Sequence, residues 1–240
     1  MERYLIQTAA RMGIEMSAEQ ASLFKRYHEM LFEANREMNL TRVSEDLREA
    51  CDRNYLDSLT LLPYLVGAQS LIDVGSGAGF PGIPLAIMRH DMHVTLIDAL
   101  GKRVAFLNGV IEALGLNAEA LHLRSEDAAR QPILRERFDV ATARAVASMD
   151  VLSEWLLPFV RISGKMLALK GLTAEEELQN AQYAIQTLGG EIVGISDAEI
   201  PGRDWQHKII CVNKIAPTPD KYPRKAGIPQ KRPLKGQVIK

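Results

Sequence analysis

The pattern of apolar and polar residues divides the chain into a helical part and an alternating part. In residues 17–36, apolar side chains recur at intervals of three and four, which predicts an amphipathic helix, and Ser17 and Gln20 have the spacing of a capping box. A second helical pattern covers about residues 45–65. Short apolar runs then alternate with amphipathic stretches. These runs lie at residues 70–74, 93–97, 119–123, 138–142, 164–169, 191–195 and 207–213.

Such alternation is typical of an α/β fold, in which helices cover both faces of a mainly parallel sheet. We therefore expect about seven strands, and amphipathic helices among them near residues 101–115, 148–160 and 173–188. The last two runs have no clear helix between them, so an antiparallel pair is expected at one edge. The predicted segments are a helical extension at 1–66, a sheet domain at 67–213 and a tail at 214–240.

Composition and cysteine usage place few limits on function. The chain has 240 residues, of which 47% are hydrophobic and 25% charged, as is ordinary for a globular core. Cys51 and Cys211 are isolated and follow no secretory segment, so we expect reduced thiols and a cytoplasmic protein. No apolar run approaches the roughly 18 residues of a membrane span, and the five histidines show no metal-ligand spacing. We expect no membrane or metal partner, and a monomer by default, because no long apolar stripe demands a partner.

Positive charge is concentrated in the tail. Residues 214–240 contain eight lysines and arginines and one acid, Asp220, so the tail carries +7 while the whole chain carries −1. The tail also contains five prolines and few apolar residues, which predicts an extended or mobile arm that cannot build a core. A basic arm of this kind favours an anionic partner.

The segment Leu71–Gly82 joins an apolar run, an acid and a series of glycines to the start of a predicted helix. Gly75, Gly77 and Gly79 would allow positive φ values and a close approach of the backbone to a ligand, as in nucleotide-binding turns. Taken alone, the glycines fit two cofactor classes. Residues 77–82 also satisfy the G-x-G-x-x-G pattern of dinucleotide binders.

Two nearby residues argue against a dinucleotide. Pro81 has no N–H to offer a pyrophosphate, and Asp73, at the strand end, would repel a phosphate but suits a cationic ligand. S-adenosylmethionine is such a ligand, because it has no phosphate and carries a sulfonium, an ammonium and a ribose diol. Asp98 ends the next apolar run and supplies a carboxylate for that diol. The pattern therefore favours S-adenosylmethionine over NAD.

Several short motifs follow one another along the chain. They are Asn39-Leu40-Thr41, Asp57-Ser58-Leu59, Asp73 to Leu85, Asp98 to Arg103, Arg124 to Asp127, Ala143 to Ala145, Ala168 to Gly171 and Thr218 to Leu234. Together they resemble the bacterial small-subunit rRNA guanine-N7 methyltransferases, also called the glucose-inhibited division protein B family. The resemblance spans about residues 20 to 235. It implies a Rossmann-like seven-strand methyltransferase sheet with an N-terminal helical extension and a basic C-terminal tail. It also implies methyl transfer from S-adenosylmethionine to N7 of one guanosine in the 16S rRNA of the small ribosomal subunit.

The resemblance also implies which residues form the site. Cofactor contacts fall on Gly75, Phe80, Ser125, Glu126 and Arg144, beside the acids and glycines discussed above. Arg144 and Lys170 each end a predicted strand, at the edge where ligands bind in open α/β sheets, so both are expected to face the target base.

Basic residues outside the cofactor site are expected to contact RNA phosphates, which position a substrate without specifying its sequence. They are Lys102, Arg103, Arg203, Lys221, Arg224, Lys225, Lys231 and Arg232. The family pattern would place an arginine directly before His207, but this chain has Gln206 there. In this segment an arginine appears only at Arg203.

The expected chemistry needs no general base. Guanine N7 is an exposed lone pair and loses no proton on methylation, so catalysis would depend mainly on placement. Three alternatives stay open from the residues alone. They are a methyltransferase for a small molecule or a protein, an NAD-dependent oxidoreductase, and a non-catalytic RNA-binding assembly protein.

Overall fold

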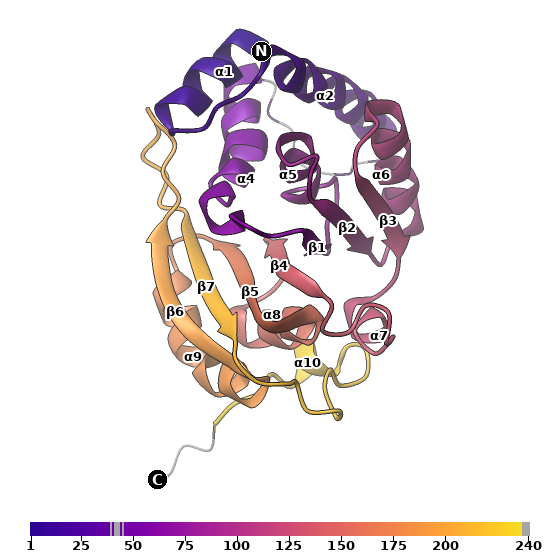
Figure 1. The fold of residues 1–240 in the computed structure, drawn as a ribbon, viewed down its shortest axis with the longest axis vertical. Helices are drawn as coiled ribbons and strands as arrows, with labels where there is room; N and C mark the ends of the chain where they lie inside the picture. Colours follow the sequence, from indigo (N-terminus) through magenta and orange to yellow (C-terminus); the bar gives the residue numbers. More distant parts are fainter. Residues whose placement is uncertain (39, 41–43, 45, 237–240) are drawn as a thin grey trace.

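The structure, a computed structural model, describes residues 1–38, 40, 44 and 46–236. One sheet has seven strands in the order β3-β2-β1-β4-β5-β7-β6 (Figure 1). The first five strands are parallel, whereas β7 runs antiparallel to both β5 and β6. The strands are β1 (Ser70–Val74), β2 (His93–Asp98), β3 (Ala118–His122), β4 (Phe138–Arg144), β5 (Val160–Lys170), β6 (Gly190–Asp197) and β7 (Lys208–Lys214). The seven predicted strands and the antiparallel pair at one edge are confirmed.

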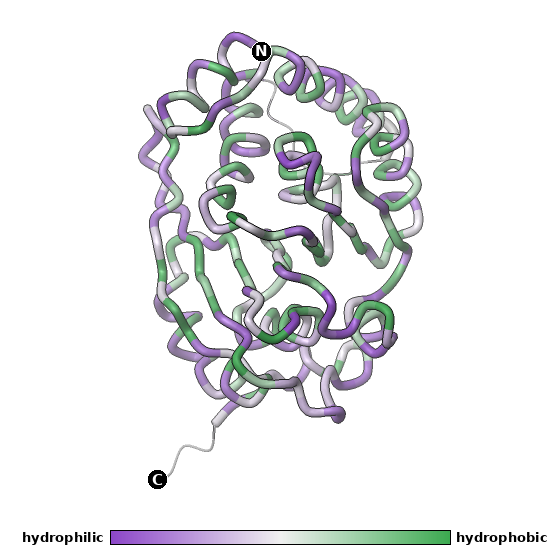
Figure 2. The backbone as a smooth tube through the Cα atoms, in the orientation of Figure 1, coloured by the Kyte–Doolittle hydropathy of each residue, from purple (hydrophilic) through white to green (hydrophobic). Residues whose placement is uncertain are grey.

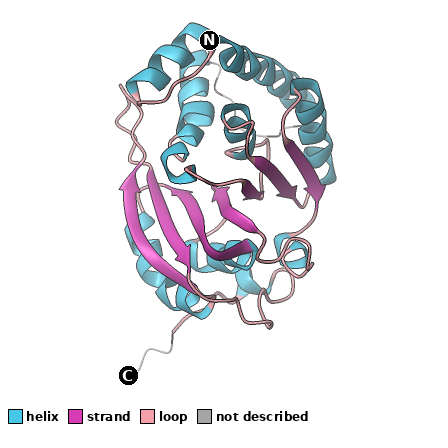
Figure 3. Ribbon diagram, in the orientation of Figure 1, coloured by secondary structure: helices cyan, strands magenta, loops and turns pink. Residues whose placement is uncertain are grey.

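Helices cover both faces of this sheet (Figure 3). One group comprises α1 (Glu2–Arg11), α2 (Ala18–Met38), α3 (Leu47–Ala50), the π-helical turn η1 (Cys51–Leu56), α4 (Asp57–Leu59), the 3₁₀ turn η2 (Leu62–Leu65), α5 (Gly82–Met88) and α6 (Gly101–Leu114). The other comprises α7 (Ser125–Ala128), α8 (Met149–Leu156), the 3₁₀ turn η3 (Leu157–Phe159), α9 (Ala174–Thr187) and the short α10 (Ile228–Lys231). None of the described helices is long and apolar enough to cross a bilayer.

Successive side chains of each strand point to opposite faces, and this divides the core in two. Leu71 of β1 joins a cluster with Phe24 and Tyr55 from the N-terminal helices, whereas Ile72 joins a second cluster with Leu152 of α8. A strand buried on both faces reads as a continuous apolar run, and Figure 2 shows such hydrophobic stretches along β5 and β7. The N-terminal extension therefore shares its core with the sheet.

The helical predictions for the N-terminal extension are confirmed. The amide of Gln20 donates to Ser17 Oγ over 3.0 Å, and the amide of Ser17 donates to Gln20 Oε1 over 2.9 Å, which is the predicted capping box. The helical segment expected at about 45–65 is confirmed, although it changes type along its length: α3, η1 and α4 follow one another without a break over 47–59, and η2 follows after a turn. Asp46 caps α3, and Pro63, which has no N–H, lies in the final 3₁₀ turn.

The tail is not a mobile arm over residues 215–236, so that prediction is wrong. Thr218, Tyr222 and Leu234 are buried. The guanidinium of Arg135 donates to the carbonyls of Thr218 and Tyr222, over 2.8 and 2.9 Å. In Figure 1 this segment passes beneath α7 and α8. Composition misleads here because the tail lends its few apolar residues to a core built elsewhere, and donors on the sheet domain hold its backbone.

Candidate active site

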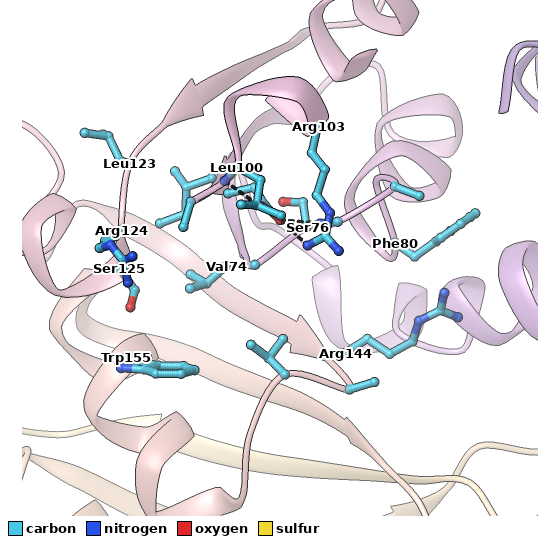
Figure 4. Close-up of a pocket in the computed structure, with 18 of the residues that line it drawn as sticks. Val74, Ser76, Phe80, Leu100, Arg103, Leu123, Arg124, Ser125, Arg144 and Trp155 are labelled. Carbon is cyan, nitrogen blue, oxygen red and sulfur yellow. Dashed lines mark hydrogen bonds and ion pairs between the residues drawn. The ribbon is translucent and has the colours of Figure 1, made fainter. Parts of the chain in front are cut away.

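A cavity of about 510 Å³ opens at the carboxyl ends of β1, β2 and β4 (Figure 4). Loops that follow four strands contribute to its wall, and the tail contributes Gly227 and Gln230. Ligands bind at this edge of open α/β sheets, where helices begin and strands end. The predicted cofactor residues that line the cavity are Gly75, Gly77, Phe80, Asp98, Ser125, Glu126 and Arg144.

The glycine turn after β1 forms the floor of this cavity. Gly75 and Gly77 have φ values of +73° and +58°, in the left-handed region that favours glycine. A Cβ atom at Gly75 would lie 3.1 Å from Cγ1 of Val146, which also lines the cavity. The turn is thus compact enough for a ligand to approach the backbone closely.

Gly79 and Asp73, both expected to contact the cofactor, do not line the cavity. They stabilise the glycine turn on the side away from it. A Cβ atom at Gly79 would meet the side chains of Ile83, Tyr27 and Leu107 within 3 Å, so this glycine lets the helices pack together. Asp73 is fully buried, and its Oδ2 accepts from the amide of Gly82 over 3.0 Å at the start of α5. Burial raises the pKa of the Asp73 carboxyl to about 7.

Asp98 presents its carboxylate to the cavity from the end of β2. Its Oδ2 accepts from the amide of Gly77 over 2.9 Å, and its Oδ1 accepts from the amide of Leu100 over 2.8 Å. The guanidinium of Arg103 also donates to Oδ2, over 3.3 Å. Arg103, expected to contact RNA, therefore lies in the cavity wall beside Asp98 (Figure 4). Lys102, its predicted companion, is exposed.

Ser125 and Glu126 begin α7 and connect the cavity to the tail. Ser125 Oγ donates to Glu126 Oε2 over 3.1 Å, and Glu126 Oε1 accepts from the amide of Gly227 over 2.9 Å. The carboxylate is buried, with 4% of the residue exposed. Sequence reasoning missed the tail's part in this wall. The one sequence feature that could have indicated it is Gly227, a glycine among prolines and basic residues, which has a φ value of +78°.

Arg144 fixes the opposite side of the cavity. Its Nη1 donates to the carbonyl of Arg53 over 2.6 Å and to Asp57 Oδ2 over 3.0 Å. Its guanidinium carbon lies 4.8 Å from the centre of the Phe80 ring, within reach of a cation–π interaction. The other carboxylate oxygen of Asp57 lies 2.7 Å from Nδ1 of His207. The extension, β4 and the loop before β7 thus meet at one buried carboxylate.

A second cavity, of about 630 Å³, adjoins the first, and the two share Arg144, Ala145 and Val146. Lys170 lines the second cavity, where its Nζ donates to the carbonyl of Ala147 and to Glu177 Oε2, the latter over 2.7 Å. The two residues expected to face the target base therefore do share one cavity. Its remaining wall comes from Arg53, Asn54, Asp57, Ser148, Leu169, Gly171, Glu177 and His207.

Besides Arg103, which pairs with Asp98, two more of the predicted RNA-binding arginines are held in ion pairs. Arg224 binds the fully buried Glu154 through both Nε and Nη2, so we correct its role to that of an anchor for the tail. Arg203 Nε donates to the buried Asp52 over 2.7 Å and Arg203 does not line the second cavity, so its RNA contact stays a prediction. The other four tail residues, Lys221, Lys225, Lys231 and Arg232, are exposed. Asn39 and Thr41 lie outside the described residues.

Comparison with known proteins decides the family. The family model described as rRNA small subunit methyltransferase G matches residues 20–204. The chain belongs to this family. A ribosomal RNA small subunit methyltransferase G from Clostridium botulinum (strain Eklund 17B / Type B) is 48% identical over 234 residues, which cover 96% of this chain and 98% of the relative. The proteins of that name from Clostridium perfringens (strain 13 / Type A) and Lactobacillus johnsonii (strain CNCM I-12250 / La1 / NCC 533) are 46% and 43% identical. They are matched over 93% and 94% of this chain, and 94% and 96% of their own lengths.

Solved structures support the same fold for this family member. The [4+2]-cyclase SpnF superposes with a TM-score of 0.55 at 15% identity, over 82% of this chain and 96% of its own. Geranyl diphosphate C-methyltransferase from Streptomyces coelicolor A3(2), solved with S-adenosyl-L-homocysteine, superposes with a TM-score of 0.53 at 12% identity, over 79% and 98%. At such identities the likeness shows the Rossmann-like methyltransferase fold alone.

Within the described ranges, no group of three or more His, Cys, Asp or Glu side chains could hold a metal ion.

Proposed function

We propose that this protein transfers a methyl group from S-adenosylmethionine to N7 of a guanosine in the 16S rRNA of the small ribosomal subunit. The observation that carries the proposal is the pair of adjoining cavities, which meet at Arg144, Ala145 and Val146. One cavity has a nucleotide-binding turn and an acid, and the other has fixed cations, so a cofactor and a base would meet across the β4 loop. Membership of the family supports the choice of rRNA.

The residues of the first cavity suit S-adenosylmethionine. The Asp98 carboxylate lies at the end of β2, where a ribose diol would donate to it. Asp98 and Glu126 are the two carboxylates in this wall, beside Arg103, Arg124 and Arg144, and they are the acceptors available to the hydroxyl, amino and ammonium donors of the cofactor. Trp155 also lines this cavity, and its Nε1 is buried with no partner among the described residues, so a donor is available to an acceptor. When bound, the cofactor supplies an electrophilic methyl group.

The residues of the second cavity suit a guanine that gains positive charge. Arg144 and Lys170 are donors that ion pairs hold in place, and each could donate to guanine O6. The carboxylates of Asp57 and Glu177 line the same cavity and would offset the charge that develops on the ring at N7. Because N7 carries a lone pair and no proton, these residues need only position the base and compensate charge.

The exposed tail residues Lys221, Lys225, Lys231 and Arg232, with Lys102 of α6, are the proposed phosphate contacts. A target base inside a small cavity must be unpaired or turned out of its helix. The substrate would therefore be an accessible loop of the rRNA, positioned by its backbone.

The proposal is tested with small ribosomal subunits that lack the modification. Incubation with labelled S-adenosylmethionine should place the label on N7 of a single guanosine, located by mapping the modified base. Label on a protein or a small molecule would instead indicate the first alternative, and subunit binding without turnover would indicate an assembly protein. Calorimetry should detect binding of S-adenosylmethionine to the protein. Tighter binding of NAD would overturn the cofactor assignment.

A further inference from the structure

Asn54 is a buried amide without partners in the wall of the second cavity. It lies in the π-helical turn η1, and 6% of the residue is exposed. Its side chain makes no hydrogen bond to any group in the described part of the chain, although its backbone carbonyl accepts from Ser58 Oγ. A side-chain amide offers two donors and one acceptor, and the amide atoms of Asn54, unlike the buried and unpaired Nε1 of Trp155, reach the cavity that the residue lines.

The other polar side chains in this wall already have partners. Arg144 and His207 both bind Asp57, and Lys170 binds Glu177. Arg53 donates to Glu49, and Ser148 donates to Asp150. Asn54 thus differs from every described polar side chain around it, because its hydrogen-bonding capacity is unused.

From this contrast we infer that Asn54 holds the target guanine by its Watson–Crick edge, which leaves N7 free. That edge presents O6 as an acceptor and N1–H as a donor. The Asn54 amide matches both, with Nδ2 donating to O6 and Oδ1 accepting from N1–H. The inference rests on the proposed function and adds a positioning residue to it. The π-helical turn explains the placement, since such turns displace side chains from the regular helical positions and occur often at functional sites.

Asn54→Leu separates a positioning role from a structural one, since leucine has a similar size and no polar atoms. The variant should melt close to the wild-type temperature, because the Asn54 side chain makes no hydrogen bond to the described residues that the substitution would remove. Its Kd for S-adenosylmethionine should stay within about twofold, while kcat/KM on small subunits should fall by at least about tenfold. Asn180→Leu, on the exposed face of α9, is the matched control and should leave all three quantities unchanged.

The decisive measurement changes the base as well as the side chain. Subunits would carry 2-aminopurine riboside at the target position, which keeps N7 and lacks both O6 and N1–H. This replacement should lower kcat/KM of the wild type by about tenfold more than it lowers that of Asn54→Leu, since a contact of Arg144 or Lys170 with O6 is lost in both proteins and only the amide contact differs between them. Equal losses of kcat/KM in the two proteins would overturn the role of Asn54 and leave the proposed function standing. Absence of wild-type methylation on guanosine would overturn the proposed function and this inference with it.

If Asn54→Leu fails to fold, Asn54→Ser, which removes the amide without adding an apolar side chain, takes its place in the same comparison. The expected result is again a loss on guanosine that 2-aminopurine deepens less than it lowers wild-type turnover. A loss that 2-aminopurine deepens as much as in the wild type would count against the inference.

Discussion

Arg144 has the most connections of the residues between the two cavities. Its guanidinium donates to Asp57 and to the Arg53 carbonyl and lies over the Phe80 ring. A lysine at this position would keep the charge but lose the planar group that stacks and donates in two directions. The side chain at position 144 would then no longer be held in the wall that the two cavities share.

We therefore expect Arg144→Lys to lower methylation of small subunits by at least about tenfold, and Arg144→Ala to lower it further. Both variants should keep the wild-type circular dichroism spectrum, although each should unfold more easily, since Asp57 is 3% exposed and loses one of its two partners. Turnover on unmethylated subunits and thermal melts measure the two effects. Wild-type turnover by Arg144→Ala would exclude the arginine from the site.

Asp73 predicts a pH dependence of stability. Burial raises the pKa of its carboxyl to about 7 in the folded protein, against 3.8 as the ordinary value. The folded state therefore binds the proton more tightly than the unfolded chain does. The stability that this proton contributes is complete below about pH 4 and is lost as pH rises through about 7.

Asp73→Asn removes this titration and keeps an oxygen that can accept from the amide of Gly82. Between pH 5 and 7, the wild type should lose roughly 2 kcal/mol of unfolding free energy relative to the variant. Urea unfolding at several pH values measures the difference. A difference that does not change with pH would contradict the raised pKa.

Among the elements, the strands could be predicted and the segments around the site could not. Leu71 and Ile72 are both buried because sheet faces are covered on both sides, and that burial is visible in the sequence as an apolar run. The π-helical turn inside the helical segment at 45–65 could not be predicted, because it goes with contacts such as that of Arg144 with the Arg53 carbonyl, which join residues far apart in the chain. Asp98 could be found because its role follows from the end of a strand, whereas Asn54 and Gly227 matter only through the cavities that tertiary structure builds around them.

The tail is the element for which the structure changes the expected experiment. Composition alone predicts that deleting residues 217–240 weakens RNA binding and spares the cofactor. The structure instead connects the tail to the cofactor cavity through Gly227, which donates to Glu126, while Arg224 anchors the tail on Glu154 of α8.

Deletion of residues 217–240 should therefore weaken the binding of S-adenosylmethionine by about tenfold or more, equivalent to about 1.4 kcal/mol. It should also destabilise the fold, because Glu154 is fully buried and would lose its ion pair. Arg224→Met tests the second effect without removing Gly227. Calorimetry on the shortened chain checks the first effect, and an unchanged Kd would show that the tail only borders the cavity.

At the scale of the whole molecule, the distribution of charge separates substrate binding from cofactor binding. The net charge is −1, so attraction to RNA cannot come from the bulk balance and must come from particular basic surfaces. Lys225, Lys231 and Arg232 lie on either side of Gly227 and Gln230 in the tail, yet they are exposed and line neither cavity. The same tail segment thus offers backbone and amide groups to the cofactor cavity and cations to solvent.

Replacing these three exposed residues together by glutamine should weaken subunit binding and reduce its dependence on salt. Each RNA phosphate that the tail no longer neutralises reduces the steepness of log K against log salt by about 0.7 to 0.9, so the steepness should fall by up to about 2 to 3. The Kd for S-adenosylmethionine should stay unchanged, because Gly227, Gln230 and Arg224 are all retained. Binding assays across a salt series, with calorimetry beside them, measure both quantities. An unchanged salt dependence would place the RNA-binding surface elsewhere. Weaker binding of S-adenosylmethionine would mean that the exposed cations of the tail also support the cofactor cavity.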